Sequence, residues 1–407
     1  MLQLQKLKDS LQIYGFLNSL FAIAAGIIGY KYAVSQNPED ISLFVKCLSI
    51  TSILQIIFIS ILSKNKNEFI ESSFNINDYR YKNNFVMFIS IIISIVFFTK
   101  FSSNIYDKNN ILFLFLFLST LKILFDSTSY IKSSRDFIFN IDRYWNIRII
   151  GTIARLISIF LFVFIFKLNY LGIIIADVIG SFTITSLYKT LPFLNIKFTI
   201  SSIKKENLLT LISFDGIIRS FQQQYENLFI NLTPIIINFI FPNNFLKINS
   251  AYLATGYLKA LTTSLRSSLS KIEIKVFKDR YKIRDFILLY FLLMIIFLIS
   301  DYKLNFSDLL LPDIEPKIKN EIFLLIFSYS CILPLTVGFS CIDYLPKKVL
   351  IKSIFILIFS YFLLISTFIP FVNLFQSYGF IFIFYPIPLS IIIPLKLFIN
   401  VKYSTKN

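Results

Sequence analysis

Long apolar runs and short polar segments alternate along the whole sequence. A helix needs about 20 apolar residues to cross roughly 30 Å of hydrocarbon, and about twelve runs approach that length. The predicted spans are 11–33, 41–63, 84–105, 109–130, 149–167, 169–190, 208–232, 248–268, 285–301, 321–344, 349–371 and 375–396. The pattern predicts an all-α integral membrane protein with about twelve transmembrane helices and no large soluble domain.

The amino-acid composition favours the same class of protein. Of the 407 residues, 56% are hydrophobic and 15% are charged, whereas about a quarter of an ordinary globular domain is charged. The chain has no histidine, and its three cysteines lie in or beside apolar runs. This excludes a histidine-dependent catalytic triad and a Cys/His zinc cluster. We therefore expect no metal and no cofactor.

The net charge of +17 does not indicate nucleic-acid binding, because no basic stripe lies on a soluble helix. With the N-terminus in the cytoplasm, 27 of the 40 lysine and arginine residues fall in cytoplasmic segments, 8 fall outside and 5 fall within spans. Cytoplasmic loops of membrane proteins carry such an excess. We therefore expect both termini in the cytoplasm.

The spans divide evenly around a basic linker near residues 197–206. Six spans precede this linker and six follow it, so both halves have the same orientation, as in parallel repeats. We predict an N-terminal lobe over residues 1–200 and a C-terminal lobe over residues 207–407.

Ionisable residues within spans are costly and usually face a bundle interior or a wet cavity. On the seventh span, Asp215, Arg219 and Glu226 fall on one helical face. The eighth span has a similar polar stripe around Lys259. At about 1.5 Å of rise per residue, Arg219 and Lys259 lie roughly 16 Å deep, near the middle of the bilayer.

The first half has a lesser set of charges within its spans. Lys122 and Asp126 lie on the fourth span, Arg148 and Arg155 on the fifth, and Asp177 on the sixth. Lys122–Asp126 is an i, i+4 pair that could neutralise itself and serve only structure, as could Asp215–Arg219. Arg155 has no such partner on its own helix, which favours a cavity role. Asp177 is interpreted as an unpaired acid that could bind a proton or sodium.

Unpaired cations in a cavity suit an anionic substrate, for example a lipid-linked pyrophosphate, because Arg and Lys are natural phosphate ligands. Two stretches carry a family resemblance. The stretch LISFDGIIRSFQQQYENLFINLTPIIINFIFPNNFLKINSAYLATGYLKALTTSLRSSL resembles the seventh and eighth helices of the polysaccharide-transporter family. The stretch RYWNIRIIGTIARLISIFLFVFIFKLNYLGIIIADVIGSF is similar to the fifth and sixth helices. These are O-antigen flippases (Wzx-like) of the multidrug/oligosaccharidyl-lipid/polysaccharide (MOP) exporter superfamily.

The resemblance implies a bacterial inner-membrane flippase with a MATE/MOP-like fold. It would move an undecaprenyl-pyrophosphate-linked O-unit from the cytoplasmic to the periplasmic leaflet by alternating access. The expected partners are this lipid-linked oligosaccharide, membrane lipid, the O-antigen polymerase and the chain-length regulator, with no nucleic acid. The residues expected to bind the pyrophosphate are Arg219 and Lys259 at mid-depth, and Arg155 and Lys122 on the cytoplasmic side. The acids expected to tune these charges, or to couple transport to H⁺ or Na⁺, are Asp215, Glu226, Asp126 and Asp177.

Two alternatives stay open at this point. A secondary antiporter or multidrug exporter of the same superfamily would need acids exposed in the cavity, and the spans hold five basic against four acidic residues. A membrane-embedded O-antigen polymerase or glycosyltransferase is less favoured. Such enzymes generally carry a long outer loop, and the longest one predicted here, about 302–320, has under twenty residues.

The predicted topology can be tested with reporter fusions. We expect fusions at Lys278 and near Lys402 to report the cytoplasm, and a fusion near Ile314 to report the periplasm, because these segments lie on opposite sides of the predicted spans. Reporter activity in intact cells is the measurement. A periplasmic signal at Lys278 would contradict the number of spans.

Overall fold

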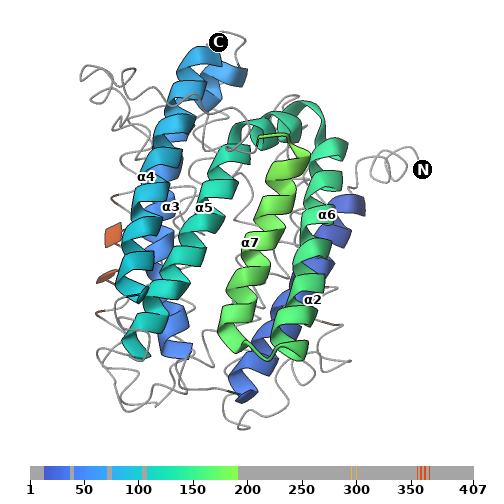
Figure 1. The fold of residues 1–407 in the computed structure, drawn as a ribbon. Helices are drawn as coiled ribbons and strands as arrows, with labels where there is room; N and C mark the ends of the chain where they lie inside the picture. Colours follow the sequence, from blue (N-terminus) through green and yellow to red (C-terminus); the bar gives the residue numbers. More distant parts are fainter. Residues whose placement is uncertain are drawn as a thin grey trace. The chain divides into compact units, whose positions relative to one another are not determined.

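The computed structural model describes residues 13–36, 41–70, 76–102 and 108–190 of the 407. It also describes the isolated helical positions 295, 299, 355, 358, 359, 362, 363 and 366. All the elements in these ranges are helical (Figure 1). They are α2 (Ile13–Gln36), α3 (Ile41–Ile70), α4 (Ile76–Ser102), α5 (Lys108–Phe139), α6 (Ile141–Ile159), the π-helix η2 (Phe160–Ile165) and α7 (Asn169–Leu187).

Each of the first six predicted spans coincides with a helix. Several helices, α5 most clearly, extend beyond the apolar run, whereas α7 ends three residues before its predicted span does. The clearest correction concerns residues 131–148, which the apolar pattern left as a loop. Instead α5 continues to Phe139 and α6 begins at Ile141, with only Asn140 between them. Lysine and arginine are good helix formers, so the helices continue after the sequence becomes too polar for hydrocarbon. The six later predicted spans lie outside the fully described ranges.

Three described helices have the length and hydropathy to cross a membrane. They cover Asn110–Tyr130, Ile141–Ile165 and Asn169–Leu187. Shorter apolar helical stretches occur at Ile13–Gly26, Leu43–Phe58 and Phe88–Ser102. Large apolar side chains are exposed along α6 and η2, which is expected of a surface that contacts lipid. They include Ile150, Ile153, Ile157 and Phe160.

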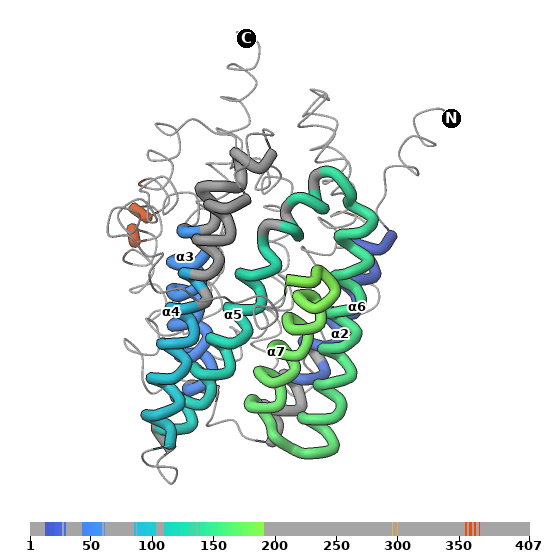
Figure 2. The backbone as a smooth tube through the Cα atoms, turned by 45° about the horizontal axis from the view of Figure 1, so that its top comes forward, coloured from blue at the N-terminus to red at the C-terminus, as the bar shows by residue number. Residues whose placement is uncertain are grey.

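By backbone proximity the chain separates into two compact units. One unit is Ala24–Asn231, and the other joins Met1–Ile23 to Leu232–Asn407. The division into lobes over 1–200 and 207–407 stays a prediction. Within the first unit, α5 packs against α3, α4 and α7, and α7 also packs against α6. Figure 2 shows α5, α7 and α6 side by side.

Apolar side chains join α3 and α4 to α5. The buried residues Phe58, Ile61, Val86 and Ile123 form one cluster from these three helices. The rings of Phe98 on α4 and Phe117 on α5 lie 5.4 Å apart between centroids. Such contacts depend on shape and are not directional.

Buried hydroxyl groups are satisfied mainly within their own helices. A serine or threonine hydroxyl can donate to the carbonyl four residues earlier, which removes an unpaired polar group from the apolar interior. The buried examples include Ser49 to Val45 (3.0 Å), Ser90 to Val86 (2.7 Å) and Thr120 to Leu116 (2.7 Å). Thr185 on α7 differs, because its Oγ1 also donates across to the Phe125 carbonyl of α5 at 2.8 Å. This hydrogen bond ties α7 to α5.

Two glycines bring α6 and α7 into close contact. A Cβ at Gly151 would overlap the Ile184 side chain and would lie 3.1 Å from the Gly180 carbonyl oxygen. A Cβ at Gly180 would lie 3.1 Å from both the Gly151 oxygen and the Arg155 Cβ. Small residues at such a crossing allow the backbones of transmembrane helices to approach closely.

The turn between α6 and α7 begins with the π-helical segment. Lys167 and Asn169 follow it with φ values of 54° and 47°, in the left-handed region that most residues avoid. Gly172 then lies against the η2 backbone, where an added Cβ would be 2.9 Å from the Phe162 carbonyl carbon. Only glycine fits this approach, so the turn returns α7 directly along α6.

The glycine crossing predicts a specific loss of stability. We expect Gly151→Ala to lower the thermal unfolding temperature of the detergent-purified protein, because overpacking of this kind costs about 1–3 kcal/mol. Gly26→Ala is the matched control, since a Cβ there meets nothing within 4 Å. Equal unfolding temperatures for the two variants would contradict the close crossing.

Candidate functional site

Half of the predicted site residues lie in the described part of the chain. Lys122 and Asp126 are on α5, Arg155 is on α6 and Asp177 is on α7, and all four are half-buried. The other half of the predicted set lies outside the described residues and stays a prediction. It consists of Arg219, Lys259, Asp215 and Glu226.

Arg155 and Asp177 form an ion pair between α6 and α7, through Arg155 Nε and Asp177 Oδ1. Their side chains are 24% and 18% exposed. The interpretation of Asp177 as an unpaired acid is therefore wrong, and Arg155 is not an isolated cation. Spacing along one helix could not reveal this pair, because the partner comes from the neighbouring helix.

The glycine crossing positions this pair. Arg155 lies one turn after Gly151 on α6, and Asp177 lies about one turn before Gly180 on α7. The Gly180 position faces the Arg155 Cβ at 3.1 Å, so the guanidinium extends along α7 toward Asp177. Asp177 lies eight residues from Asn169, where its span begins, or roughly 12 Å along the helix axis. The pair is therefore near the middle of the span.

Lys122 and Asp126 do not pair with each other. Asp126 interacts electrostatically with Arg148 of α6. Lys122 has no carboxylate within ion-pair distance among the described residues. It lies close to Cys47 of α3, whose Sγ is 3.3 Å from the Ser119 Oγ of α5. Lys122 is thus a half-buried cation in an apolar and hydroxyl-lined position.

A polar stripe follows one face of α5. Its members are spaced alternately by three and four residues, which keeps them on one side of a helix. They are Ser119, Lys122, Asp126, Ser129 and Ser133. The serines are buried and the two charged residues are half-buried.

Arg148 of α6 lies along this stripe. Its Nη2 donates to the Ser133 Oγ at 3.3 Å, and its guanidinium lies 5.5 Å from the centre of the Tyr144 ring. The predicted binding set left Arg148 out. The signal for it was present, since Arg148 and Arg155 are seven residues apart and share a helical face.

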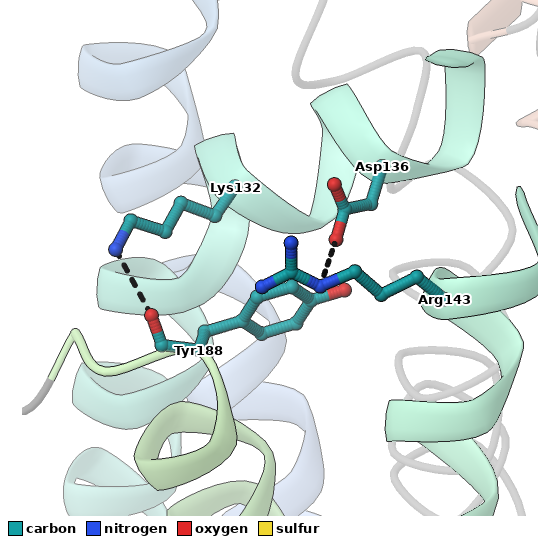
Figure 3. A network of polar contacts seen from close by, with 4 residues as sticks. All are labelled: Lys132, Asp136, Arg143 and Tyr188. Carbon is teal, nitrogen blue, oxygen red and sulfur yellow. Dashed lines mark hydrogen bonds and ion pairs between the residues drawn. The ribbon is translucent and has the colours of Figure 1, made fainter. Parts of the chain in front are cut away.

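A second cluster of charged side chains lies where α5 ends, α6 begins and α7 ends (Figure 3). Lys132 Nζ donates to the Tyr188 carbonyl oxygen at 2.9 Å, and Arg143 Nε lies 3.3 Å from Asp136 Oδ2. Nowhere in the described ranges do three His, Cys, Asp or Glu side chains form a group that could hold a metal ion. The described chemistry is therefore that of lysine, arginine and their carboxylate partners.

No family model and no curated protein matches this sequence. Solved structures do match it over nearly its whole length. A mutant of the Vibrio cholerae MATE transporter VcmN has 10% identity and a TM-score of 0.58, with 99% of this chain and 97% of that chain covered. An outward-facing multidrug resistance MATE transporter of the MOP superfamily has 13% identity and a TM-score of 0.58, with 98% and 96% covered.

A third structure comes from Pyrococcus furiosus, with 12% identity, a TM-score of 0.54, and 98% of this chain and 96% of that chain covered. It is described as a MOP superfamily transporter in which a reversed polarity of the binding pocket suggests a different function. Identities this low show a shared fold. The chain therefore shares the all-helical membrane fold of the MATE transporters.

Proposed function

We propose that this protein is a flippase for a lipid-linked oligosaccharide. It would move an undecaprenyl-pyrophosphate-linked O-unit from the cytoplasmic to the periplasmic leaflet of a bacterial inner membrane by alternating access. The MATE-like fold supports a transporter of this superfamily. The observation that carries the choice of substrate is the charge balance inside α5, α6 and α7.

Asp177 and Asp126, the two acids deep within these spans, each interact with an arginine of α6. Asp177 pairs with Arg155, and Asp126 interacts with Arg148. Lys122 remains as a half-buried cation with no carboxylate partner in the described part of the chain. Uncompensated charge in a span usually faces a wet pathway. The excess is positive, so the ligand that compensates it is an anion.

This balance favours an anionic substrate over a cationic drug. An exporter of organic cations needs carboxylates that are free to bind them, whereas Asp177 is paired with Arg155 and Asp126 interacts electrostatically with Arg148. Pocket polarity differs within this fold, as the description of the Pyrococcus furiosus transporter indicates for that protein. The fold is shared with transporters, which leaves the enzyme alternative without support.

The proposed roles follow from depth and charge. Lys122 lies eight residues before Tyr130, roughly 12 Å from that end of the span, and would contact the pyrophosphate first. Arg155 would bind it next, with a phosphate oxygen replacing the Asp177 carboxylate. The released Asp177 could then bind H⁺ or Na⁺, which would couple the ion to transport. Arg219 and Lys259 would bind the pyrophosphate in the second half of the protein.

Lys122 provides the first test. In a strain that lacks its own O-antigen flippase, we expect Lys122→Ala to abolish surface O-antigen, because the compensating cation for the phosphate is lost. Lys122→Arg should keep part of the activity, since the charge remains. Surface O-antigen and membrane protein level are measured together.

Lys46→Ala is the matched control for Lys122. Lys46 lies on the neighbouring helix α3 and is exposed, so its removal should leave transport unchanged. Normal O-antigen in Lys122→Ala at normal protein level would remove Lys122 from the proposed pathway.

The Arg155–Asp177 pair provides the second test. We expect Arg155→Gln and Asp177→Asn, made singly, to lower the amount of protein in the membrane, because an unpaired buried charge costs about 3–5 kcal/mol. The double variant removes both charges and should restore the protein level. Its transport should stay absent, because the arginine that binds the phosphate is gone.

The double variant separates a functional pair from a purely structural one. The measurements are protein level in the membrane and surface O-antigen for both single variants and the double variant. Recovery of protein level and of transport together would mean that the pair only holds α6 to α7.

A further inference from the structure

Three cations from three helices meet at one end of the α5–α6–α7 group. Lys132 extends from α5, Arg143 lies in the first turn of α6, and Lys189 directly follows the residue at which α7 is capped. Lys132 Nζ is held at 2.9 Å from the Tyr188 carbonyl oxygen, so Lys132 and Lys189 are neighbours across two helices. Figure 3 shows Lys132 and Arg143 at this junction, on either side of Tyr188. We call these three cations the basic corner.

The basic corner carries more positive charge than the described carboxylates compensate. Arg143 lies 3.3 Å from the Asp136 carboxylate, which leaves two of the three charges in excess. Partial burial lowers the pKa of Lys132, and the positive charges of Arg143 and Lys189 lower that pKa further against the opposing effect of Asp136. The exposed Arg135 and Asp142 nearby have opposite charges and cancel in the balance.

All three cations lie within two residues of a span end. Lys132 is two residues beyond Tyr130, Arg143 is two residues after Ile141, and Lys189 is two residues beyond Leu187, where the respective spans end or begin. At about 1.5 Å of rise per residue, each Cα lies about 3 Å along its helix from a span end. That is the level of lipid headgroups, and aromatic residues are typical there. Tyr144 and the buried Trp145 and Tyr188 lie beside the corner.

We propose that the basic corner binds the phosphate groups of a lipid headgroup. Basic pockets between transmembrane helices bind anionic headgroups in this way. Arg143 offers a planar guanidinium that can bind two phosphate oxygens, and the two lysines offer compact charges. Two excess positive charges fit a headgroup with two negative charges. This chemistry is shared by the diphosphate headgroup of cardiolipin and by a lipid-linked pyrophosphate, and only the second source rests on the proposed flippase function.

The test measures lipid-dependent stability of the full-length protein in a zwitterionic detergent. Cardiolipin, undecaprenyl pyrophosphate, phosphatidylcholine and inorganic pyrophosphate are titrated separately, and the unfolding temperature is recorded. We expect at least one of the two anionic lipids to raise this temperature in a saturable way, and phosphatidylcholine to leave it unchanged. A response to inorganic pyrophosphate without a response to either anionic lipid would overturn the headgroup assignment.

The variant Arg143→Gln/Lys189→Gln tests the site itself. Both side chains are exposed, Arg143 by 58%, but Arg143 also pairs with the largely buried Asp136. The variant's own unfolding temperature without lipid is therefore the reference for its titrations. Its apparent affinity for the lipid should fall about thirtyfold, given the typical contribution of a basic residue near a lipid surface. Lys132 is left intact, because its bond to Tyr188 also caps α7.

Lys167→Gln is the matched control. Lys167 is exposed and has a φ of 54°, close to the 51° of Lys189, but it lies at the opposite end of α7. It should bind lipid as the wild type does. An equal loss in Lys167→Gln, or no loss in the double variant, would overturn the proposal.

The two lipid sources are separated by the same titrations. A response to cardiolipin that is lost in the double variant supports the site even if the protein proves not to be a flippase. A response to undecaprenyl pyrophosphate alone, lost in the double variant, supports the site as the first docking position of the transported lipid.

Discussion

The contact between the backbones of Gly151 and Gly180 determines where the polar groups of α6 and α7 lie. With any larger residue at these positions the helices would separate, and Arg155 would no longer reach Asp177. The two glycines and the two charges therefore form one unit. The glycines allow α6 and α7 to come close enough for the ion pair to form, and the apolar surroundings strengthen the attraction between its charges.

The apolar surroundings also determine how the many buried polar groups find their partners. A chain in hydrocarbon must satisfy each polar group internally. Most buried hydroxyls do so locally, by donating to a carbonyl of their own helix, as Ser90 and Thr120 do. The charges are matched between helices instead: Arg155 pairs with Asp177, and Arg148 interacts electrostatically with Asp126. Lys122 is the half-buried exception among the described residues, and the proposed substrate chemistry follows from it.

The apolar pattern was sufficient to predict the class of fold and the positions of the first six helices. It misplaced the α5–α6 junction, because hydropathy detects the hydrocarbon layer, whereas helix formation at Lys132 and Asp136 depends on propensity and packing. The pattern also selected Lys122, Asp126, Arg155 and Asp177 as charges within spans. It could not assign their partners, because helical spacing predicts neighbours on one helix only, and the pairs depend on how α5, α6 and α7 pack.

The two kinds of helix contact have different mechanical consequences. The named contacts of α4 with α5 are ring and side-chain packing, which can be exchanged for similar packing when one helix slides along the other. α7 is joined to α5 by the Thr185 hydrogen bond and to α6 by the glycine crossing and its ion pair. Sliding there would break directional bonds in a medium that offers no replacement. The contacts that hold α7 to α5 and α6 therefore resist sliding more strongly than the named contacts between α4 and α5.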